Sequence, residues 1–570
     1  MLLPLLLALA PFAPQVPAES AGAAATSEPH ATRAAAEILA AGGNAVDVAV
    51  AAGFALAVTY PTAGNLGGGG FLLYREPGGR AWFLDFREVA PAAAHPMLYR
   101  DADGGVDTRA AQFGWTAAGV PGSVPGLLEA HRRWGSLPRE QLLAPAIRLA
   151  EDGFAMTREH FRSFRDEGEL LRRDPMARRL FFGADGAPLE VGTLLQQPEL
   201  AATLRRIAAE GDAPFRSGAL VEELVAASAA GGGILTAADF EAYAPELRPV
   251  VRLDWHGLEI LAAPPPSSGG VYLTQMLRSL EGHPLAEWGW ADGRSVQLLG
   301  EASARAFADR NRWLGDPAGF DFELRGLLLP AMLQARSRAL RGDRFTPSDA
   351  LEPTPLPVAA AEPPQPPREG EETTHYSVVD AAGGAVAVTT TLNGSFGAKV
   401  MAPGGFFMNN EMDDFAAAPG TANQYGLVQS GYNAVRAGRR PLSSMCPAIV
   451  VRGGAIDAVV GSPGGPRILS AVLQVILNRY LFDMGPLAAV AAPRMHRQDR
   501  PATLRFEPGR LDSAARAFLA GLGQPVEIYE GIGDVNAIFR IDGGWRAVAD
   551  PRWSGLGLEV EAGVRPVPDR

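Results

Sequence analysis

The residue best placed for chemistry is Thr373, which lies where the character of the sequence changes abruptly. The stretch before it, LEPTPLPVAAAEPPQPPREGEE at 351–372, is rich in Pro, Ala and Glu. This composition cannot form a packed core and predicts an extended, exposed linker. If the chain were cut after Glu372, Thr373 would carry both a hydroxyl and a free α-amino group. A hydroxyl nucleophile with its own amine as base is a known catalytic arrangement.

The residues that follow predict a β-hairpin with a second hydroxyl. TTHYSVVD and AVAVTTTLN have strand propensity, and DAAGG at 380–384 is a turn sequence. With Ala382 at the middle of the turn, Thr391 faces Thr373, and directly opposed residues have Cβ atoms about 4.5–5.5 Å apart. The Thr391 hydroxyl could therefore hold the rotamer of Thr373. Threonine is also a common strand residue, so the hairpin alone does not establish a chemical role.

Composition narrows the class of protein. The chain has 570 residues, 47% hydrophobic and 20% charged, which is typical of a soluble globular protein with a sizeable core. A net charge of −12 without a basic cluster argues against a nucleic-acid partner. The single cysteine, Cys446, excludes an internal disulfide and a thiolate metal cluster. The histidines fall in no metal-ligand spacing, so no motif calls for a metal or an organic cofactor.

The N-terminal sequence MLLPLLLALAPFAPQVPAES contains an apolar run that is too short for a permanent membrane anchor. Small residues at Val16-Pro17-Ala18 offer a cleavage position, so residues 1–18 are predicted to be a secretory signal peptide. Export would place the protein in the periplasm or the medium. The usual basic residues before the apolar run are missing. A misassigned start codon or a buried N-terminal segment is the alternative interpretation.

Helical and glycine-rich patterns predict the elements that would position the site. Residues 31–58 form two Ala-rich helical patterns broken at 42–44, and about 127–341 is mostly helical. The glycine run from Gly67 to Gly70 cannot be helical and suggests that the backbone approaches another group closely. It lacks the spacing of a phosphate-binding or dinucleotide-binding loop.

Two segments carry charged groups that could bind a ligand. Arg87 ends the strand pattern AWFLDFRE, where an arginine is usually solvated or ion-paired. The alternative is a bidentate clamp for a carboxylate, which suits the planar guanidinium group. The sequence NNEMDD crowds amide and acidic groups, including Glu411 and Asp414, into a short turn. Acidic turns are commonly just solvated.

Two further turns offer hydroxyl and backbone N–H groups. Ser443 and Ser444 lie just before an apolar strand pattern, an unusual place for paired hydroxyls. Gly464 and Gly465 separate a strand pattern from a helical one. Backbone N–H groups at such a turn can bind an anion or an oxyanion.

In combination, these segments resemble the γ-glutamyltransferases, also called glutathione hydrolases, of the N-terminal nucleophile hydrolase superfamily. The matching segments span roughly residues 24–555, in family order, and read GNAVDVAVAAGFALAV, NLGGGGF, FLDFRE, GVPG, TTHYSVVD, NNEMDDF, RPLSSM, GSPGG and DPR. One such motif would be weak evidence, whereas nine in order leave little room for chance.

The resemblance implies roles for individual residues. Thr373 matches the nucleophile, which is freed by autocatalytic cleavage after Glu372, and Thr391 matches the hydroxyl that supports it. The groups that hold the α-carboxylate of a γ-glutamyl substrate match Arg87, Ser443 and Ser444. The groups that hold its α-ammonium match Asn393, Glu411 and Asp414. The oxyanion hole matches Gly464 and Gly465.

Four positions refine the resemblance. The segment PGTANQYG matches the family's lid loop, with Tyr425 as its aromatic residue, and its presence favours a covered glutathione site. Glu411 stands where many bacterial members have Gln, and Glu372 stands where Gln is expected before the nucleophile. Neither departure removes a required group. His375 shares a strand face with Thr373 and is assigned a structural role.

The implied fold is α+β, a four-layer αββα sandwich formed by two chains from one precursor. The expected division is a signal peptide at 1–18, a large subunit at 19–350, a Pro-rich linker at 351–372 and a small catalytic subunit at 373–570. Both parts would build one interdigitated domain rather than two independent ones.

The implied activity is that of a self-processing enzyme that cleaves glutathione and related γ-glutamyl compounds. The acyl group would pass to water, amino acids or dipeptides, and the two subunits would form a heterodimer without a stable membrane span. Two alternatives remain open: a related acylase with a glutaryl-type donor, and an uncleaved secreted amino-acid-binding protein. A glutaryl group lacks an α-ammonium, so the acidic cluster argues against the acylase.

Overall fold

The computed structural model describes residues 20–100, 103, 105–320, 323–356, 373–417, 430–542 and 544–561. The predicted signal peptide at 1–18, most of the linker at 351–372, Glu372 and Tyr425 lie outside these residues. Among the described helices, none combines the length and apolar character needed to cross a membrane.

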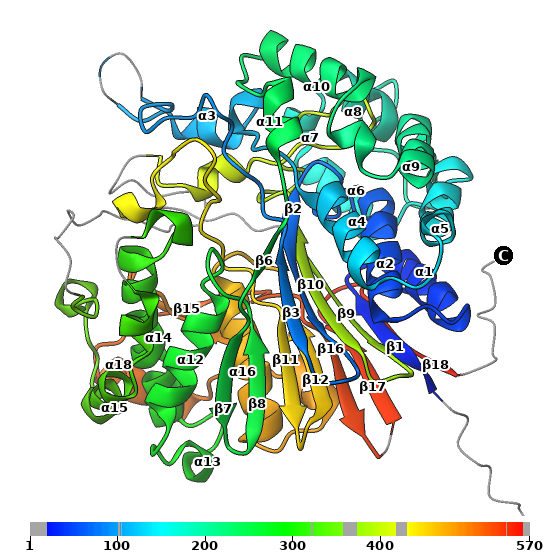
Figure 1. The fold of residues 1–570 in the computed structure, drawn as a ribbon. Coiled ribbons are helices and arrows are strands. Elements are labelled where there is room, and N and C mark those ends of the chain that lie inside the picture. Colours follow the sequence, from blue (N-terminus) through cyan, green and yellow to red (C-terminus); the bar gives the residue numbers. More distant parts are fainter. Residues whose placement is uncertain are drawn as a thin grey trace, which may run out of the picture.

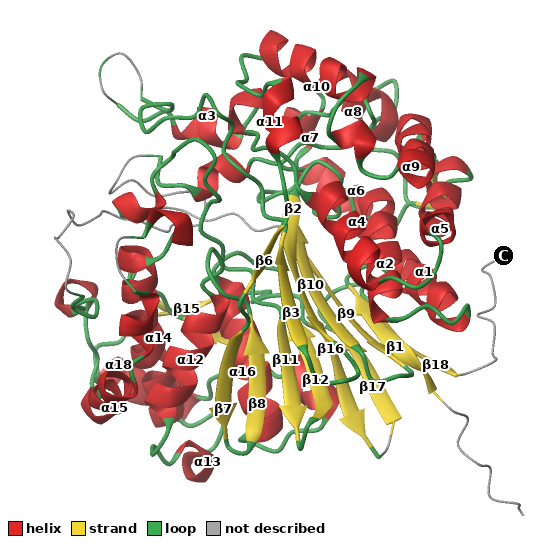
Figure 2. Cartoon of the chain, in the orientation of Figure 1, coloured by secondary structure: helices red, strands yellow, loops and turns green. Residues whose placement is uncertain are grey.

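Two stacked sheets form the centre of the molecule (Figures 1 and 2). In order across the first sheet, the strands are β18 (Leu556–Glu561), β1 (Ser20–Thr26), β9 (Thr373–Asp380), β10 (Ala385–Thr391), β2 (Gly69–Arg75), β3 (Ala81–Asp85) and β6 (Glu246–Arg248). The second sheet contains β17 (Gly544–Ala549), β16 (Asn536–Ile541), β12 (Ala455–Gly461), β11 (Ala448–Arg452), β8 (Leu258–Ala262) and β7 (Val251–Trp255). Neighbouring strands in both sheets are antiparallel.

Helices cover the outer face of each sheet (Figure 1). The first sheet is covered by α1 (Pro29–Ala40), α2 (Ala45–Thr59) and α4 (Ser123–Trp134), and α5 (Arg139–Glu151) packs against α2. The second is covered by α12 (Gly269–Leu280) and α16 (Arg467–Tyr480), and α14 (Gly293–Trp313) packs against α12. The break predicted at 42–44 is present, and Asn44 caps α2 by accepting hydrogen bonds from the backbone N–H groups of Val46 and Asp47.

Shorter elements surround these layers. Six further helices follow α5 in the sequence and precede the first strand of the second sheet. They are α6 (Arg158–Asp166), α7 (Gly168–Leu171), α8 (Pro175–Phe181), α9 (Pro198–Glu210), α10 (Ala219–Ala230) and α11 (Ala237–Ala242). The other helices are α3 (Thr108–Gln112), α13 (Leu285–Trp288), α15 (Pro330–Ala339), α17 (Pro486–Ala491) and α18 (Ser513–Gly521). Two small sheets are formed by β4 (Phe154–Ala155) with β5 (Leu194–Leu195), and by β13 (Met495–His496), β14 (Leu504–Phe506) and β15 (Val526–Ile528).

Strand alternation divides the core into layers. In β9, Val378 packs in the cluster that contains α1 and α2, whereas its neighbour Val379 packs in the cluster that contains the second sheet. Val388 and Ala387 of β10 divide in the same way, because successive side chains of a strand point to opposite faces. Apolar residues on one face of the first sheet thus pack against helices, and those on its other face pack against the second sheet. The layers therefore follow the order helices, sheet, sheet, helices. The predicted α+β, four-layer αββα architecture is confirmed.

Residues before and after Thr373 are interleaved in the first sheet. The hairpin of β9 and β10 lies between β1 and β2, and the last strand, β18, pairs with the other edge of β1. In the second sheet, β11 pairs with β8 from the earlier part of the chain. One core is therefore built jointly by the two parts.

Candidate active site

Thr373 is the first residue of β9, and it is buried next to its predicted partner. The strand register pairs Thr373 with Thr391, so the predicted hairpin register is confirmed. The two Oγ1 atoms are 3.3 Å apart. Thr391 Oγ1 also accepts a hydrogen bond from the backbone N–H of Asn393 at 2.8 Å, which orients this hydroxyl beside Thr373.

The glycine run brings another backbone segment against Thr391. Asn65 donates from Nδ2 to the Thr391 carbonyl oxygen at 2.9 Å and accepts from the Gly68 N–H at 3.0 Å. A Cβ atom at Gly68 would overlap the same carbonyl oxygen. The close approach predicted for Gly67 to Gly70 is confirmed, and it fixes the end of β10.

A small pocket of about 20 Å³ opens beside Thr373. Its lining includes six of the residues predicted to bind the substrate, which are Arg87, Asn393, Glu411, Asp414, Ser443 and Ser444. Thr391 and Gly465 line the same pocket. These residues come from five separate segments of the chain, and the fold brings them to one place. Tyr425, the seventh, lies outside the described residues.

Arg87 is the central cation of this pocket, and its side chain is only 1% exposed. It forms ion pairs with Glu411 and, at 2.5 Å, with Asp414. It also donates to the backbone carbonyl oxygens of Pro441 and Leu442, each at 3.3 Å. Burial opposes the charge of Arg87, but the neighbouring carboxylates outweigh it and raise its pKa. Arg87 is therefore a buried, ion-paired group that lines the same pocket as Thr373.

Carboxylates outnumber cations around Arg87. Glu88, a residue that the sequence analysis did not single out, is also buried and lies 3.8 Å from the Arg87 guanidinium. Burial raises the pKa of Glu411 well above its usual range and raises that of Glu88 to about 7, although Arg87 opposes both changes. An additional cation, such as a substrate ammonium group, would stabilise the ionised forms of these acids.

The turn before Glu411 is held by two asparagines. Asn393 has a φ of 74°, a left-handed conformation that asparagine tolerates better than most residues. Its Nδ2 donates to the Asn410 carbonyl oxygen at 3.0 Å, and Asn410 Oδ1 accepts from the Gly394 N–H at 2.8 Å. These bonds join the end of the hairpin to the acidic turn.

Arg310 of α14 is a second buried cation in the pocket, and sequence reasoning missed it. It donates to Ser444 Oγ at 2.9 Å and to Ser268 Oγ at 3.1 Å. Within the described part of the chain, no carboxylate oxygen lies within ion-pair distance of it, and burial lowers its pKa to about 10. Nothing in the helical pattern ADRNRW distinguishes this arginine from a surface residue, because its place depends on packing against α12 and the Ser443–Ser444 turn.

Gly464 and Gly465 form the turn that precedes α16, with φ values of 123° and 54° that glycine adopts without strain. Gly465 lines the small pocket, whereas Gly464 lines a larger cavity on the other side of Thr373. Thr373 therefore borders both the small pocket and the larger cavity, and so does the glycine turn. Such a turn at the start of a helix is suited to bind a developing negative charge.

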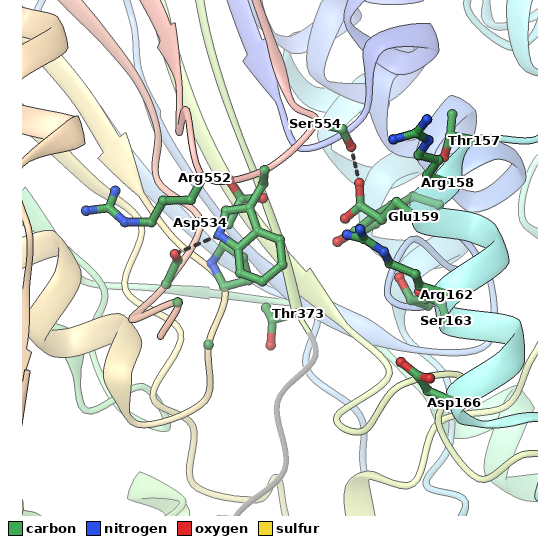
Figure 3. A pocket seen from close by; sticks show the side chains of 17 residues that line it. Thr157, Arg158, Glu159, Arg162, Ser163, Asp166, Thr373, Asp534, Arg552 and Ser554 are labelled. Atoms are coloured by element: carbon green, nitrogen blue, oxygen red, sulfur yellow. Dashed lines mark hydrogen bonds between the residues drawn. The ribbon is translucent and has the colours of Figure 1, made fainter. Parts of the chain in front are cut away.

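The larger cavity has a volume of about 570 Å³ (Figure 3). One wall is the exposed face of α6, and the other contains Asp534. Trp553 also lines the cavity. Thr373 lies between these walls at the start of its strand. Among the described residues, none of those predicted for substrate binding lines this cavity.

His375 lies on the same strand face as Thr373 but is held in the core. Its ring nitrogens hydrogen-bond Thr389 Oγ1 at 2.8 Å and Ser377 Oγ at 3.1 Å, and burial lowers its pKa to about 3. A neutral imidazole fixed in this way agrees with the structural role assigned from the sequence.

Comparisons with known proteins show which proteins the chain resembles. A family model described as gamma-glutamyltranspeptidase matches residues 31–560. The chain is 42% identical over 507 residues to a glutathione hydrolase proenzyme from Pseudomonas sp. strain A14, covering 88% of this chain and 86% of that protein. It is 36% identical over 554 residues to the Acylase ACY 1 proenzyme from Pseudomonas sp. strain SE83, covering 96% and 94%.

A solved structure supports the architecture. Cephalosporin acylase from Bacillus halodurans matches with a TM-score of 0.82 over 97% of this chain and 99% of that chain, at 24% identity. At that identity, the likeness shows the fold alone. Because the relatives by sequence include both glutathione hydrolases and acylases, the acyl group must be inferred from the pocket.

Proposed function

Because this chain belongs to the gamma-glutamyltranspeptidase family, which is a family of enzymes, we propose that it is a self-processing γ-glutamyltransferase and glutathione hydrolase. The observation that carries the proposal is the small pocket beside Thr373, in which a buried arginine is paired with two carboxylates. A γ-glutamyl group carries a carboxylate and an ammonium at its far end. Such a zwitterion can replace the internal ion pairs without a change in net charge.

In this proposal, each end of the zwitterion has its own partners. The substrate carboxylate displaces the acidic side chains from Arg87 and accepts hydrogen bonds from Ser443 and Ser444. The substrate ammonium is held by the released carboxylates of Glu411 and Asp414 and by Asn393. Arg310, bonded to Ser444, holds that hydroxyl in place and adds positive potential at the carboxylate end.

The reaction begins after the bond between Glu372 and Thr373 is cleaved. The new α-amine of Thr373 has an unperturbed pKa of about 7.7–8.0, so it can accept the hydroxyl proton near neutral pH. Thr373 Oγ1 attacks the γ-amide carbonyl, and the turn of Gly464 and Gly465 donates to the oxyanion. Each such donor is typically worth about 2.7–4 kcal/mol. The amine leaves, and water or an acceptor amine then cleaves the γ-glutamyl ester.

The division of the precursor is part of the same proposal. A signal peptide at 1–18 directs export to the periplasm or the medium, and cleavage gives a large subunit that ends in the linker 351–372 and a small subunit of residues 373–570. Tyr425 belongs to a lid over the substrate. The interleaved strands support a heterodimer that stays together after cleavage.

The acylase alternative has one specific observation in its favour, which is the identity to the Acylase ACY 1 proenzyme. A glutaryl donor has no ammonium group, so it would leave Glu411 and Asp414 buried without a new cation. Comparing turnover of γ-glutamyl and glutaryl anilides distinguishes the two. A preference for the glutaryl substrate would overturn the proposal.

Self-processing is tested on a denaturing gel with N-terminal sequencing. We expect two bands in a mass ratio of about 2:1, because 372 residues precede Thr373 and the segment 373–570 has 198 residues. The smaller band should begin Thr-Thr-His-Tyr. Thr373→Ser, which keeps a hydroxyl, should still be cleaved, whereas Thr373→Ala should remain one chain without activity. An uncleaved wild-type chain that binds amino acids would favour the binding-protein alternative.

A further inference from the structure

The larger cavity beside Thr373 contains buried polar groups without partners. Asp534 is 5% exposed, and its Oδ1 atom has no hydrogen-bond partner within the described structure. The same holds for Oγ1 of Thr62, another buried residue of the cavity lining. Unpaired buried polar groups are costly, so two of them lining one cavity indicate a place for a ligand that can donate and accept hydrogen bonds.

The opposite wall of the cavity carries both cations and carboxylates. Arg158 and Arg162 lie one turn apart on α6, and both line the cavity. Two carboxylates of α6 line it too: Glu159, which accepts a hydrogen bond from Ser554, and Asp166, which pairs with Arg165. Neither the Arg158 nor the Arg162 guanidinium forms an ion pair or a hydrogen bond with another described side chain. Figure 3 shows Arg162 extending from α6 toward the cavity. Arg552 points away from it, toward its ion pairs with Asp550 and Glu507.

The position of the cavity follows from the geometry of an amide. The acyl part of an amide and its amine part lie on opposite sides of the carbonyl carbon that Thr373 attacks. If the γ-glutamyl part fills the small pocket, the amine part must extend into the space on the other side of Thr373. An acceptor amine that attacks the acyl-enzyme reverses this step and must approach from the same side.

We propose that this cavity is the site for the acceptor, and that it selects an amino acid or short peptide by both of its charged ends. Asp534 receives the α-ammonium group near Thr373, and Arg162, with Arg158 behind it, receives the carboxylate. This inference rests on the proposed γ-glutamyl transfer. Trp553, which lies beside Gly533 and borders the cavity, offers an apolar surface for the side chain between the two ends.

The ionisation of Asp534 suits this role. Burial, reinforced by Asp550, raises its pKa to about 8. A bound ammonium group would favour the carboxylate form and could then transfer one proton to it. The neutral amine forms the new C–N bond at the acyl carbon, the C–O bond to Thr373 breaks, and the second amine proton passes to Thr373 Oγ1. The carboxyl group of Asp534 returns its proton to solvent.

The test uses the processed enzyme with γ-glutamyl anilide as donor and two acceptors, glycylglycine and glycylglycinamide. The second acceptor keeps the amine but lacks the carboxylate. Arg162→Gln should raise the KM for glycylglycine about fivefold, as expected for one partly exposed ion pair. The KM for glycylglycinamide and the rate of hydrolysis should stay within twofold. Arg165→Gln is the control, because Arg165 lies on the same helix but pairs with Asp166 instead.

Asp534→Asn should raise the KM for both acceptors about tenfold, because the amine end is common to them and the lost bond involves a charged group. Hydrolysis in the same preparation should stay within twofold, which also shows that the variant is folded and processed. If Asp534→Asn is not processed, Thr62→Val removes the other unpaired group of the cavity and should raise both KM values about threefold.

The outcomes separate the two proposals. If Asp534→Asn lowers the rates of hydrolysis and transfer equally, the proposed acceptor site is wrong. The proposed cleavage of γ-glutamyl compounds would not be affected by that result. Equal effects of Arg162→Gln on the two acceptors would overturn the assignment of a carboxylate to α6. A wild-type enzyme that does not cleave γ-glutamyl anilide would overturn both proposals.

Discussion

The hydroxyl of Thr391 contacts Thr373 Oγ1 and the backbone N–H of Asn393, so its removal tests how Thr373 is positioned. Thr391→Val keeps the shape of the side chain but loses the contact to Thr373 Oγ1. We expect kcat for γ-glutamyl anilide to fall about 10- to 100-fold, as for a hydrogen bond to a charged group in the transition state. The KM should stay within threefold. Thr391→Ser should recover most of the lost rate, and a fully active valine variant would contradict the role.

Glu88, another single residue, leads to a prediction about how the free energy of unfolding depends on pH. Its pKa is raised from 4.5 to about 7 by burial, so between these values the folded protein holds a proton that the unfolded chain releases. Stability contributed by this group therefore falls as the pH rises from 4.5 through 7. Glu88→Gln removes this loss. Relative to wild type, the variant should gain stability, on the order of 3 kcal/mol, between pH 4.5 and pH 8.

Urea unfolding of Glu88→Gln and wild type at both pH values measures this difference directly. Comparing the two proteins cancels the titration of the other acidic groups. A stability difference that does not change with pH would show that Glu88 is ionised throughout the range.

The element that fixes the site is the contact between the glycine run and the end of β10. Gly68→Ala would place a methyl group against the Thr391 carbonyl oxygen, which is backbone and cannot move aside cheaply. We expect a loss of about 1–3 kcal/mol in unfolding free energy and a lower kcat, because β10 must shift. Gly78→Ala is the control, since a Cβ there meets no atom within 4 Å. Equal effects at both positions would contradict the argument.

At the scale of single elements, the local sequence predicts the features that depend on residues close together in the chain. The register of β9 and β10 follows from a five-residue turn, so Thr391 could be placed opposite Thr373 before the fold was known. Arg310 and Asp534 could not be found in this way. Each lies in the site because a remote helix or strand packs there, and neither has a local pattern that marks it. The predicted substrate-binding residues came from the family resemblance and not from hydrophobic periodicity.

The whole molecule is one core shared by two segments, which predicts how the processed protein behaves. After cleavage, the large and small subunits should elute together under native conditions, because β9 and β10 remain paired with β1 and β2. Residues 373–570 expressed alone should be insoluble or unfolded, since the outer edges of this hairpin lose their partners. A soluble, folded small subunit would show that the two segments are separate domains.

The order of the strands is the part of the fold that no local pattern could supply. Nothing in the sequence of β18 indicates that it pairs with β1, more than 500 residues earlier in the chain. This pairing depends on which apolar faces must be covered once the other strands are assembled. Only the resemblance to a known family predicted the four layers.

The interleaved strands also affect whether the protein folds more readily before or after cleavage. An uncut chain folds as one body, at a rate that does not depend on concentration, whereas two separated chains must first find each other. Once cut, the enzyme would refold only as fast as its halves meet, and dilute samples unfolded by heat would be slow to recover. A cut before Thr373 would therefore leave the protein dependent on the fold reached before cleavage, and its lifetime would depend on the height of the unfolding barrier.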